Sequence, residues 1–172
     1  LKMLYLCKRK ELSFPEWIKT INIIPVSISY EYDPLDVIKA SGWDHHEKMS
    51  LEEINESDLQ ELAKGLFGDK GRVHLHICEP VDFDGDDIEE LSAEIEQDIL
   101  SNYKIWPSSH IAAKELSISD SAFNYFDESQ IDLSQESKFL KRFHGIEEKV
   151  RKECLQTYAR PMLNKKKARG EL

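Results

Sequence analysis

Apolar and polar residues alternate in two short stretches of the chain, and each stretch predicts a β-strand. In the first, from Ile24 to Tyr32, every second residue is apolar or aromatic, and Pro25 lies near its start; the second runs from Arg72 to Cys78. Because successive side chains of a strand point to opposite faces, each strand should have one apolar and one polar face. We expect the apolar face of the first strand to be buried. Pro25 cannot donate a ladder hydrogen bond, so it should lie near the strand start, at an edge or at a bulge.

Helical patterns precede, separate and follow the strands. Ser13-Phe14-Pro15-Glu16 is a capping box with proline in the first turn, which predicts a short helix to about Thr20. A helix-spaced stripe that stops at Gly68 should face the core: Leu59, Leu62, Ala63, Leu66 and Phe67. Further helices are expected at residues 1–10, 35–40, 87–103 and 111–116, and as two helices hinged near Gly145 that end at Pro161. We expect a mobile loop at residues 117–135 and a disordered basic tail at residues 165–169.

Strands mixed with helices predict an α/β fold. Its form should be a fragment of a mixed sheet with flanking helices, followed by a mostly helical C-terminal region. We assign residues 1–103 to the α/β part and residues 104–172 to a helical extension with a basic tail. A sheet fragment leaves an edge and an apolar face uncovered unless other polypeptide packs there.

Charge is distributed unevenly along the chain. The net charge of −10 argues against general nucleic-acid binding, which needs a basic surface. Residues 82–98 hold nine acidic and no basic residues, whereas residues 137–169 hold eleven Lys or Arg against three Glu. The basic helices fit two alternatives equally, an anionic membrane surface or a solvated face that pairs with the acidic helix.

Composition bears on location. No apolar stretch approaches the roughly 20 residues of a membrane-spanning helix. The three cysteines are far apart, which argues against a disulfide framework and favours a reducing cytosol. We expect a cytoplasmic protein, with the inner face of the cell membrane as its possible working surface.

Histidines and acids form patterns that metal sites also use. Asp44-His45-His46-Glu47 lies in a polar insertion, and His74-x-His76 places two imidazoles on one strand face. Neither group has evident distant ligands, so a solvated loop and packing histidines are favoured, and we predict no metal site. The acidic residues 82–87 depart from calcium-loop spacing and instead suit a helix N-terminus.

A serine hydrolase is a further alternative. Ser27 or Ser29, with His74 or His76 and Glu31, would supply its residue types. The strained turn that exposes such a nucleophile needs Gly-x-Ser-x-Gly, which the sequence lacks.

Five segments resemble, in the same order, a bacterial branch of the glycerolipid acyltransferase superfamily. They are residues 21–26, 25–34, 71–80, 102–107 and 158–162. The hallmark of that superfamily is His, four residues, then Asp, and this sequence does not contain it, so we assign no catalytic residue. In the family order the catalytic pair would precede residue 1, and the chain would be the C-terminal half of an enzyme.

The resemblance implies transfer of a fatty acyl group from a thioester to a glycerol-phosphate-type hydroxyl in phospholipid synthesis. The acyl donor would be acyl-CoA or an acyl-carrier protein, with no cofactor. Substrate or acyl binding is carried over to Ile23, Ile24, Pro25 and Val26. We add Tyr30 and Glu31, because the polar end of a strand can order a catalytic group, and expect Glu31→Ala to lower acylation without unfolding the protein.

A second hypothesis belongs to another class. The chain would be a non-catalytic interaction module that docks a partner through an exposed sheet edge and its helical tail. The expected partners are a preceding half of the same protein or another chain at the sheet edge, the acyl donor and an anionic membrane surface, but not nucleic acid.

Overall fold

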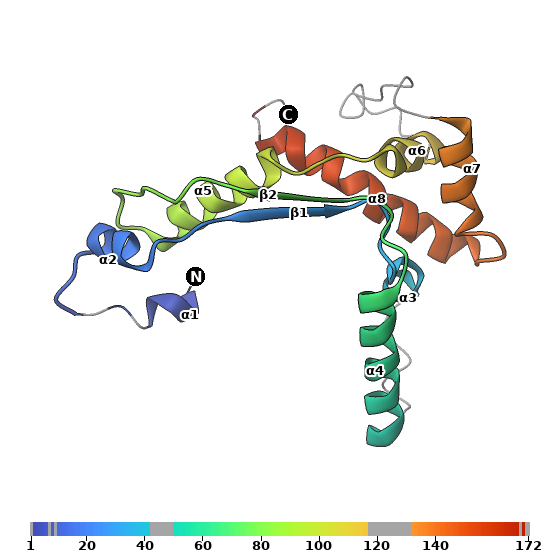
Figure 1. Cartoon of the computed structure of the whole chain (residues 1–172), viewed down its shortest axis with the longest axis horizontal. Coiled ribbons are helices and arrows are strands. Elements are labelled where there is room, and N and C mark those ends of the chain that lie inside the picture. The colour runs from blue at the N-terminus through green and yellow to red at the C-terminus, as the bar shows by residue number, and fades with distance from the viewer. Residues whose placement is uncertain are drawn as a thin grey trace. The chain divides into compact units, whose positions relative to one another are not determined.

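The computed structural model describes residues 2–6, 8, 10–41, 50–116, 132–168 and 170. The predicted fold class is confirmed: helices flank a two-stranded antiparallel sheet, and the C-terminal region is helical (Figure 1). The elements are α1 Lys2–Tyr5, α2 Phe14–Ile21, β1 Val26–Tyr30, α3 Asp36–Ala40, α4 Leu51–Phe67, β2 Val73–Ile77, α5 Ile88–Ser101, α6 Pro107–Glu115, α7 Leu133–Lys141 and α8 Glu148–Ala168.

The chain packs as two compact units, each built from separate segments. Unit 1 comprises Leu1–Ser29, His74–Lys104 and Asn164–Leu172, and unit 2 comprises Tyr30–Val73 and Ile105–Leu163. Each unit is a group of segments that pack together within this chain. This grouping does not test the predicted division into an α/β part at residues 1–103 and a helical extension at residues 104–172, which stays a prediction.

Unit 1 has a small core in which α2 packs against α5. Helix α2 begins with the predicted capping box, because the Ser13 hydroxyl accepts the Glu16 N–H and the Glu16 carboxylate accepts the Ser13 N–H. Trp17 and Ile18 are buried with Leu91 of α5 in an apolar cluster. Burial of these side chains holds the two helices together.

The acids before α5 have local structural roles, as expected. Asp87 is the N-cap of α5 and accepts the Glu89 N–H at 2.8 Å. Asp82 and Asp84 form ion pairs with Lys19 at 3.4 and 3.1 Å. The interpretation of this segment as a helix start is therefore confirmed.

Unit 2 has a larger core formed by α6, α7 and α8. Ile111, Phe139 and Leu155 are almost fully buried in it. The Phe139 ring lies edge-on to the Tyr158 ring, with centroids 4.9 Å apart. Aromatic packing thus fixes α7 against α8.

Two expectations for the C-terminal region are wrong. Helix α8 continues through Pro161 and includes residues 165–168 of the predicted disordered tail. A proline removes one helical N–H donor, and here Met162 is buried in the unit 2 core directly after it, which offsets that loss. Lys165 donates to the Tyr103 carbonyl at 2.7 Å and so ties the end of α8 to the segment after α5.

The stripe on α4 and the apolar face of β1 are also not where we expected them. No residue of α4 is buried, and Leu59, Leu62 and Leu66 are exposed. The apolar face of β1 is likewise exposed, with the serine face buried instead. The insertion with Asp44, His45, His46 and Glu47 and most of the predicted mobile loop lie outside the described residues.

Candidate functional site

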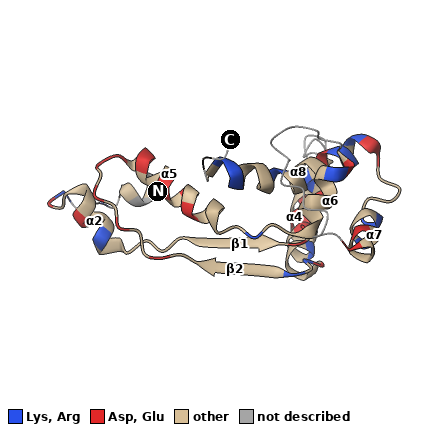
Figure 2. Ribbon diagram, turned by 90° about the horizontal axis from the view of Figure 1, so that it is seen from above, with Lys and Arg blue, Asp and Glu red and all other residues tan. Residues whose placement is uncertain are grey.

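The β1–β2 ribbon is the element to which most predicted site residues belong. The N–H of Cys78 donates to the Pro25 carbonyl at 3.0 Å, which sets the antiparallel register. In this register Ser27 faces His76 and Ser29 faces His74. The two strands of the ribbon lie side by side in both views (Figures 1 and 2).

One face of the ribbon in unit 1 is apolar and exposed. Its side chains are between 40% and 64% exposed: Ile24, Val26, Ile28, Leu75 and Ile77. Within the described residues no other side chain covers this face enough to bury any of them. The alternation continues into unit 2, where Tyr30 and Val73 are also exposed. Apolar side chains gathered on one face are typical of a surface that binds a ligand or another polypeptide.

The opposite face of the ribbon is polar, and the serines of β1 on it are buried whereas the histidines of β2 are half-buried. Ser27 and Ser29 are 0% and 1% exposed, and their hydroxyl oxygens have no hydrogen-bond partner among the described residues. The His74 and His76 rings lie nearly parallel with centroids 6.4 Å apart. The buried Nδ1 of His74 likewise has no hydrogen-bond partner there. This polar face therefore belongs to the interior of unit 1.

Within the described part of the chain, these residues are not assembled into a hydrolase triad, because the Ser27 and Ser29 hydroxyls bind no histidine. Glu31, the acid of the imagined triad, binds Arg72. Among the described residues, no three His, Cys, Asp or Glu side chains are grouped to hold a metal ion. His74 and His76 lie half-buried on the same face of β2.

Glu31, just after β1, is held by Arg72, just before β2. The Glu31 carboxylate accepts hydrogen bonds from Nε and Nη2 of Arg72 at 2.9 and 3.0 Å and from the Arg72 N–H at 3.0 Å. The guanidinium also lies over the Trp106 ring, 4.9 Å from its centroid. Burial raises the pKa of the Glu31 carboxyl, but the hydrogen bonds and charge of Arg72 outweigh this and lower it below its ordinary value.

This geometry gives Glu31 a structural role. A bidentate pair between a buried carboxylate and a guanidinium fixes both side chains. The carbonyl of Glu31 also accepts a hydrogen bond from the Ser108 hydroxyl at 2.7 Å. Glu31 therefore joins the end of the ribbon to α6. Its carboxylate also holds the Arg72 guanidinium over the Trp106 ring.

The other predicted binding residues fall into two sets. Ile24, Val26 and Tyr30 are exposed, whereas Pro25 is buried on the serine side and Ile23 packs against the unit 1 core. The ribbon thus brings Ile24 and Val26 together on one surface, with Ile23 and Pro25 supporting them. Sequence reasoning did not assign Leu75 and Ile77 to the binding surface. Their alternation with polar residues in the second stretch was a signal that could have identified them.

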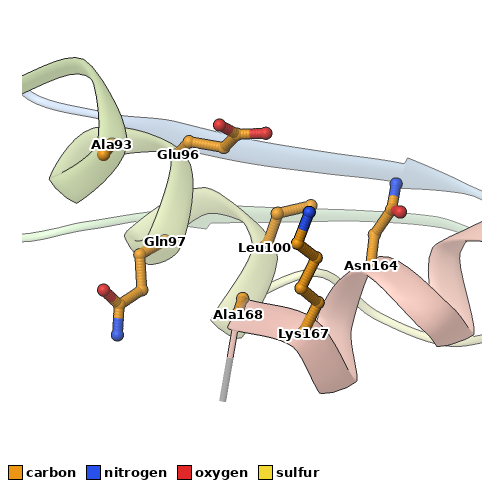
Figure 3. Close-up of a pocket in the computed structure, with 7 residues that line it drawn as sticks. All are labelled: Ala93, Glu96, Gln97, Leu100, Asn164, Lys167 and Ala168. Atoms are coloured by element: carbon orange, nitrogen blue, oxygen red, sulfur yellow. The ribbon is translucent and has the colours of Figure 1, made fainter. Parts of the chain in front are cut away.

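An open cavity of about 360 Å³ lies between α5 and the end of α8 in unit 1 (Figure 3). Its lining combines charged, amide and apolar groups: Ala93, Glu96, Gln97, Leu100, Asn164, Lys167 and Ala168. Acidic residues mark α5 and basic residues mark the last turn of α8 (Figure 2). The acidic and basic segments singled out in the sequence therefore approach each other at this end of α8.

Comparison of the chain with protein-family models, curated proteins and solved structures finds no match. Within the described residues, every helix is too short or too polar to cross a membrane.

Proposed function

We propose that the chain forms the C-terminal part of an acyltransferase that moves a fatty acyl group from a thioester to a glycerol-phosphate-type hydroxyl. The observation that carries the proposal is the exposed apolar face of the β1–β2 ribbon. Support comes from the pairing of β1 with β2, because these strands carry two of the segments that resemble glycerolipid acyltransferases.

Acyl transfer needs a general base, an oxyanion stabiliser and a surface for the acyl chain. The ribbon supplies the last of these. Ile24, Val26 and Ile28 alternate along an extended strand, so their side chains form a straight apolar row. An alkyl chain laid along such a row gains about 0.8 kcal/mol for each methylene removed from water. The base and the oxyanion stabiliser would come from polypeptide that precedes this chain.

The buried side of the ribbon gives this surface its rigidity. Pro25 restricts the backbone at the start of β1, and the Glu31–Arg72 pair fixes the other end. When a binding surface is already held at both ends, the protein loses less conformational entropy as a flexible acyl chain binds to it. The donor would be acyl-CoA or an acyl-carrier protein, and the reaction would take place in the cytoplasm or at the inner face of the cell membrane.

The same observation supports a second candidate function, an interaction module. In a two-stranded sheet both strands are edges, so each strand presents outward-facing N–H and C=O groups to a partner. A partner strand could pair with either edge and extend the apolar face.

Acyl binding tests the proposal. The 172-residue chain is titrated with palmitoyl-CoA, next to Ile28→Asp and the matched control Leu59→Asp, which adds the same charge at an exposed apolar position of α4. We expect Ile28→Asp to weaken binding by about tenfold or more, as a charge placed in an apolar contact does, and Leu59→Asp to leave it unchanged. In the gene product that carries the chain, Ile28→Asp should likewise lower acyl transfer to glycerol 3-phosphate or lysophosphatidate.

Equal binding by the parent chain and Ile28→Asp, or no binding by either, would contradict the acyl-binding role. Loss of a protein partner in Ile28→Asp, with no acyl-CoA binding by the parent, would favour the interaction module instead.

A further inference from the structure

Helix α4 is a long helix that is well formed by its own sequence but scarcely packed. It has 17 residues, and it begins with a capping box in which the Ser50 hydroxyl and the Glu53 carboxylate satisfy each other's backbone N–H. One face is half-buried, along Ile54, Ser57 and Gly65, and the Leu35 side chain lies close to Gly65. No residue along its length is buried.

The face of α4 away from this half-buried side is apolar. Leu59, Leu62 and Leu66 follow each other at intervals of three and four residues, so they form one row. They are 66%, 58% and 63% exposed, and Phe67 beside them is 87% exposed. A row with this spacing is the pattern by which an amphipathic helix binds a groove.

Acidic residues border this apolar row. Glu56 lies one turn before Leu59, and Asp58 lies one turn before Leu62, so both carboxylates neighbour the leucines. Residues 51–67 contain five acidic side chains and one lysine. Neither Glu56 nor Asp58 forms an ion pair within the described part of the chain.

We propose that α4 is a docking helix for a helix of another protein, whose apolar face is bordered by Lys or Arg. The leucine row would supply the buried anchors, and the acidic border would select the charge of the partner helix. A second copy of α4 fits poorly, because its own acids would face these acids across the interface. An anionic membrane would also repel this helix. The binding surface is separate from the β1–β2 ribbon and does not depend on acyl transfer.

The test selects partners without presuming their sequence. A phage library of 16-residue helical peptides is selected on the 172-residue chain and counter-selected on Leu62→Asp. We expect the recovered peptides to combine an apolar face with an excess of Lys and Arg over Asp and Glu. Their affinity should fall about tenfold or more in Leu62→Asp, and it should also fall in Glu56→Lys and Asp58→Lys.

Ile28→Asp is the matched control, since it places the same charge on the other exposed apolar face and should leave peptide binding unchanged. Far-UV circular dichroism checks that each variant keeps its helix content. The proposal is overturned if no peptides are enriched, if the enriched peptides are neutral or acidic, or if Leu62→Asp binds them as well as the parent. It is equally overturned if Leu62→Asp abolishes self-association of the chain or its sedimentation with phosphatidylglycerol vesicles.

Discussion

Tyr158 of α8 and Asp36 of α3 are joined by a hydrogen bond of 2.9 Å between the phenol hydroxyl and the carboxylate. The same phenol oxygen accepts the Asp33 N–H at 2.7 Å, and Arg142, the C-cap residue of α7, donates to the Asp36 carboxylate at 2.8 Å. Three elements of unit 2 therefore meet at one buried carboxylate. Burial, reinforced by the charge of Asp36, raises the pKa of the Tyr158 phenol, so the phenol remains a donor at neutral pH.

Tyr158→Phe should destabilise the protein. The substitution keeps the ring against Phe139 but removes both hydrogen bonds of the hydroxyl, which should lower the free energy of unfolding by about 1–3 kcal/mol. Urea denaturation followed by circular dichroism measures the difference. Tyr30→Phe is the control, because Tyr30 is 43% exposed and its loss of a hydroxyl should cost little. Equal stability of the two variants would contradict a stabilising role for the Tyr158 hydroxyl.

Glu31→Gln should remove a pH-dependent part of the stability. The folded-state pKa of Glu31 lies below its ordinary value of 4.5, so the Glu31–Arg72 pair stabilises the fold at pH values above 4.5. That stabilisation is lost as the pH falls through the folded-state pKa. At pH 7 the variant should be about 1–3 kcal/mol less stable than the parent.

Denaturation midpoints measured between pH 7 and pH 3 check the pH dependence of Glu31. The difference between parent and Glu31→Gln should shrink towards acid pH, whereas Glu94→Gln on the exposed side of α5 should follow the parent throughout. A difference that stays constant with pH would exclude an ionised Glu31 as its source. A protein destabilised in this way would also revise our expectation that Glu31→Ala leaves the fold intact.

Truncation of two isoleucines of unit 1 should destabilise the protein to different extents. Ile18 is 0% exposed in the core between α2 and α5, whereas Ile28 is 43% exposed on the ribbon. Ile18→Ala should cost about 2–5 kcal/mol of unfolding free energy, because it leaves a cavity. Ile28→Ala should cost under about 1 kcal/mol, the span of strand propensities. Thermal melting of both variants measures the loss of stability. A large loss of stability in Ile28→Ala would show that the apolar face of the ribbon is covered.

Ser27→Ala should leave stability unchanged or raise it. The Ser27 hydroxyl is fully buried and has no hydrogen-bond partner among the described residues, so its removal takes away a desolvated polar group. We expect a gain of about 0–1 kcal/mol in the free energy of unfolding. Ser108→Ala is the contrast, since that hydroxyl donates to the Glu31 carbonyl and its removal should destabilise. A loss of stability in Ser27→Ala would reveal a bound water or another partner of the hydroxyl.

Much of the secondary structure followed from local sequence signals. The capping box at Ser13 and the glycine after the leucine stripe predicted α2 and the end of α4, because caps act within one turn of a helix. Alternation predicted both strands. Pro161 misled the prediction of α8, since a local helix-breaking preference is weaker than burial of Met162 in the core.

The sequence by itself determined that β1 has two chemically different faces and that α4 has an apolar row, because both are properties of spacing along one segment. It did not determine which face each element buries. Only the tertiary structure decided that the serines of β1 lie inside, that the leucines of α4 stay exposed, and that Glu31 meets Arg72 across 41 residues of chain. Burial depends on which segments distant in sequence pack together, and no local pattern carries that information.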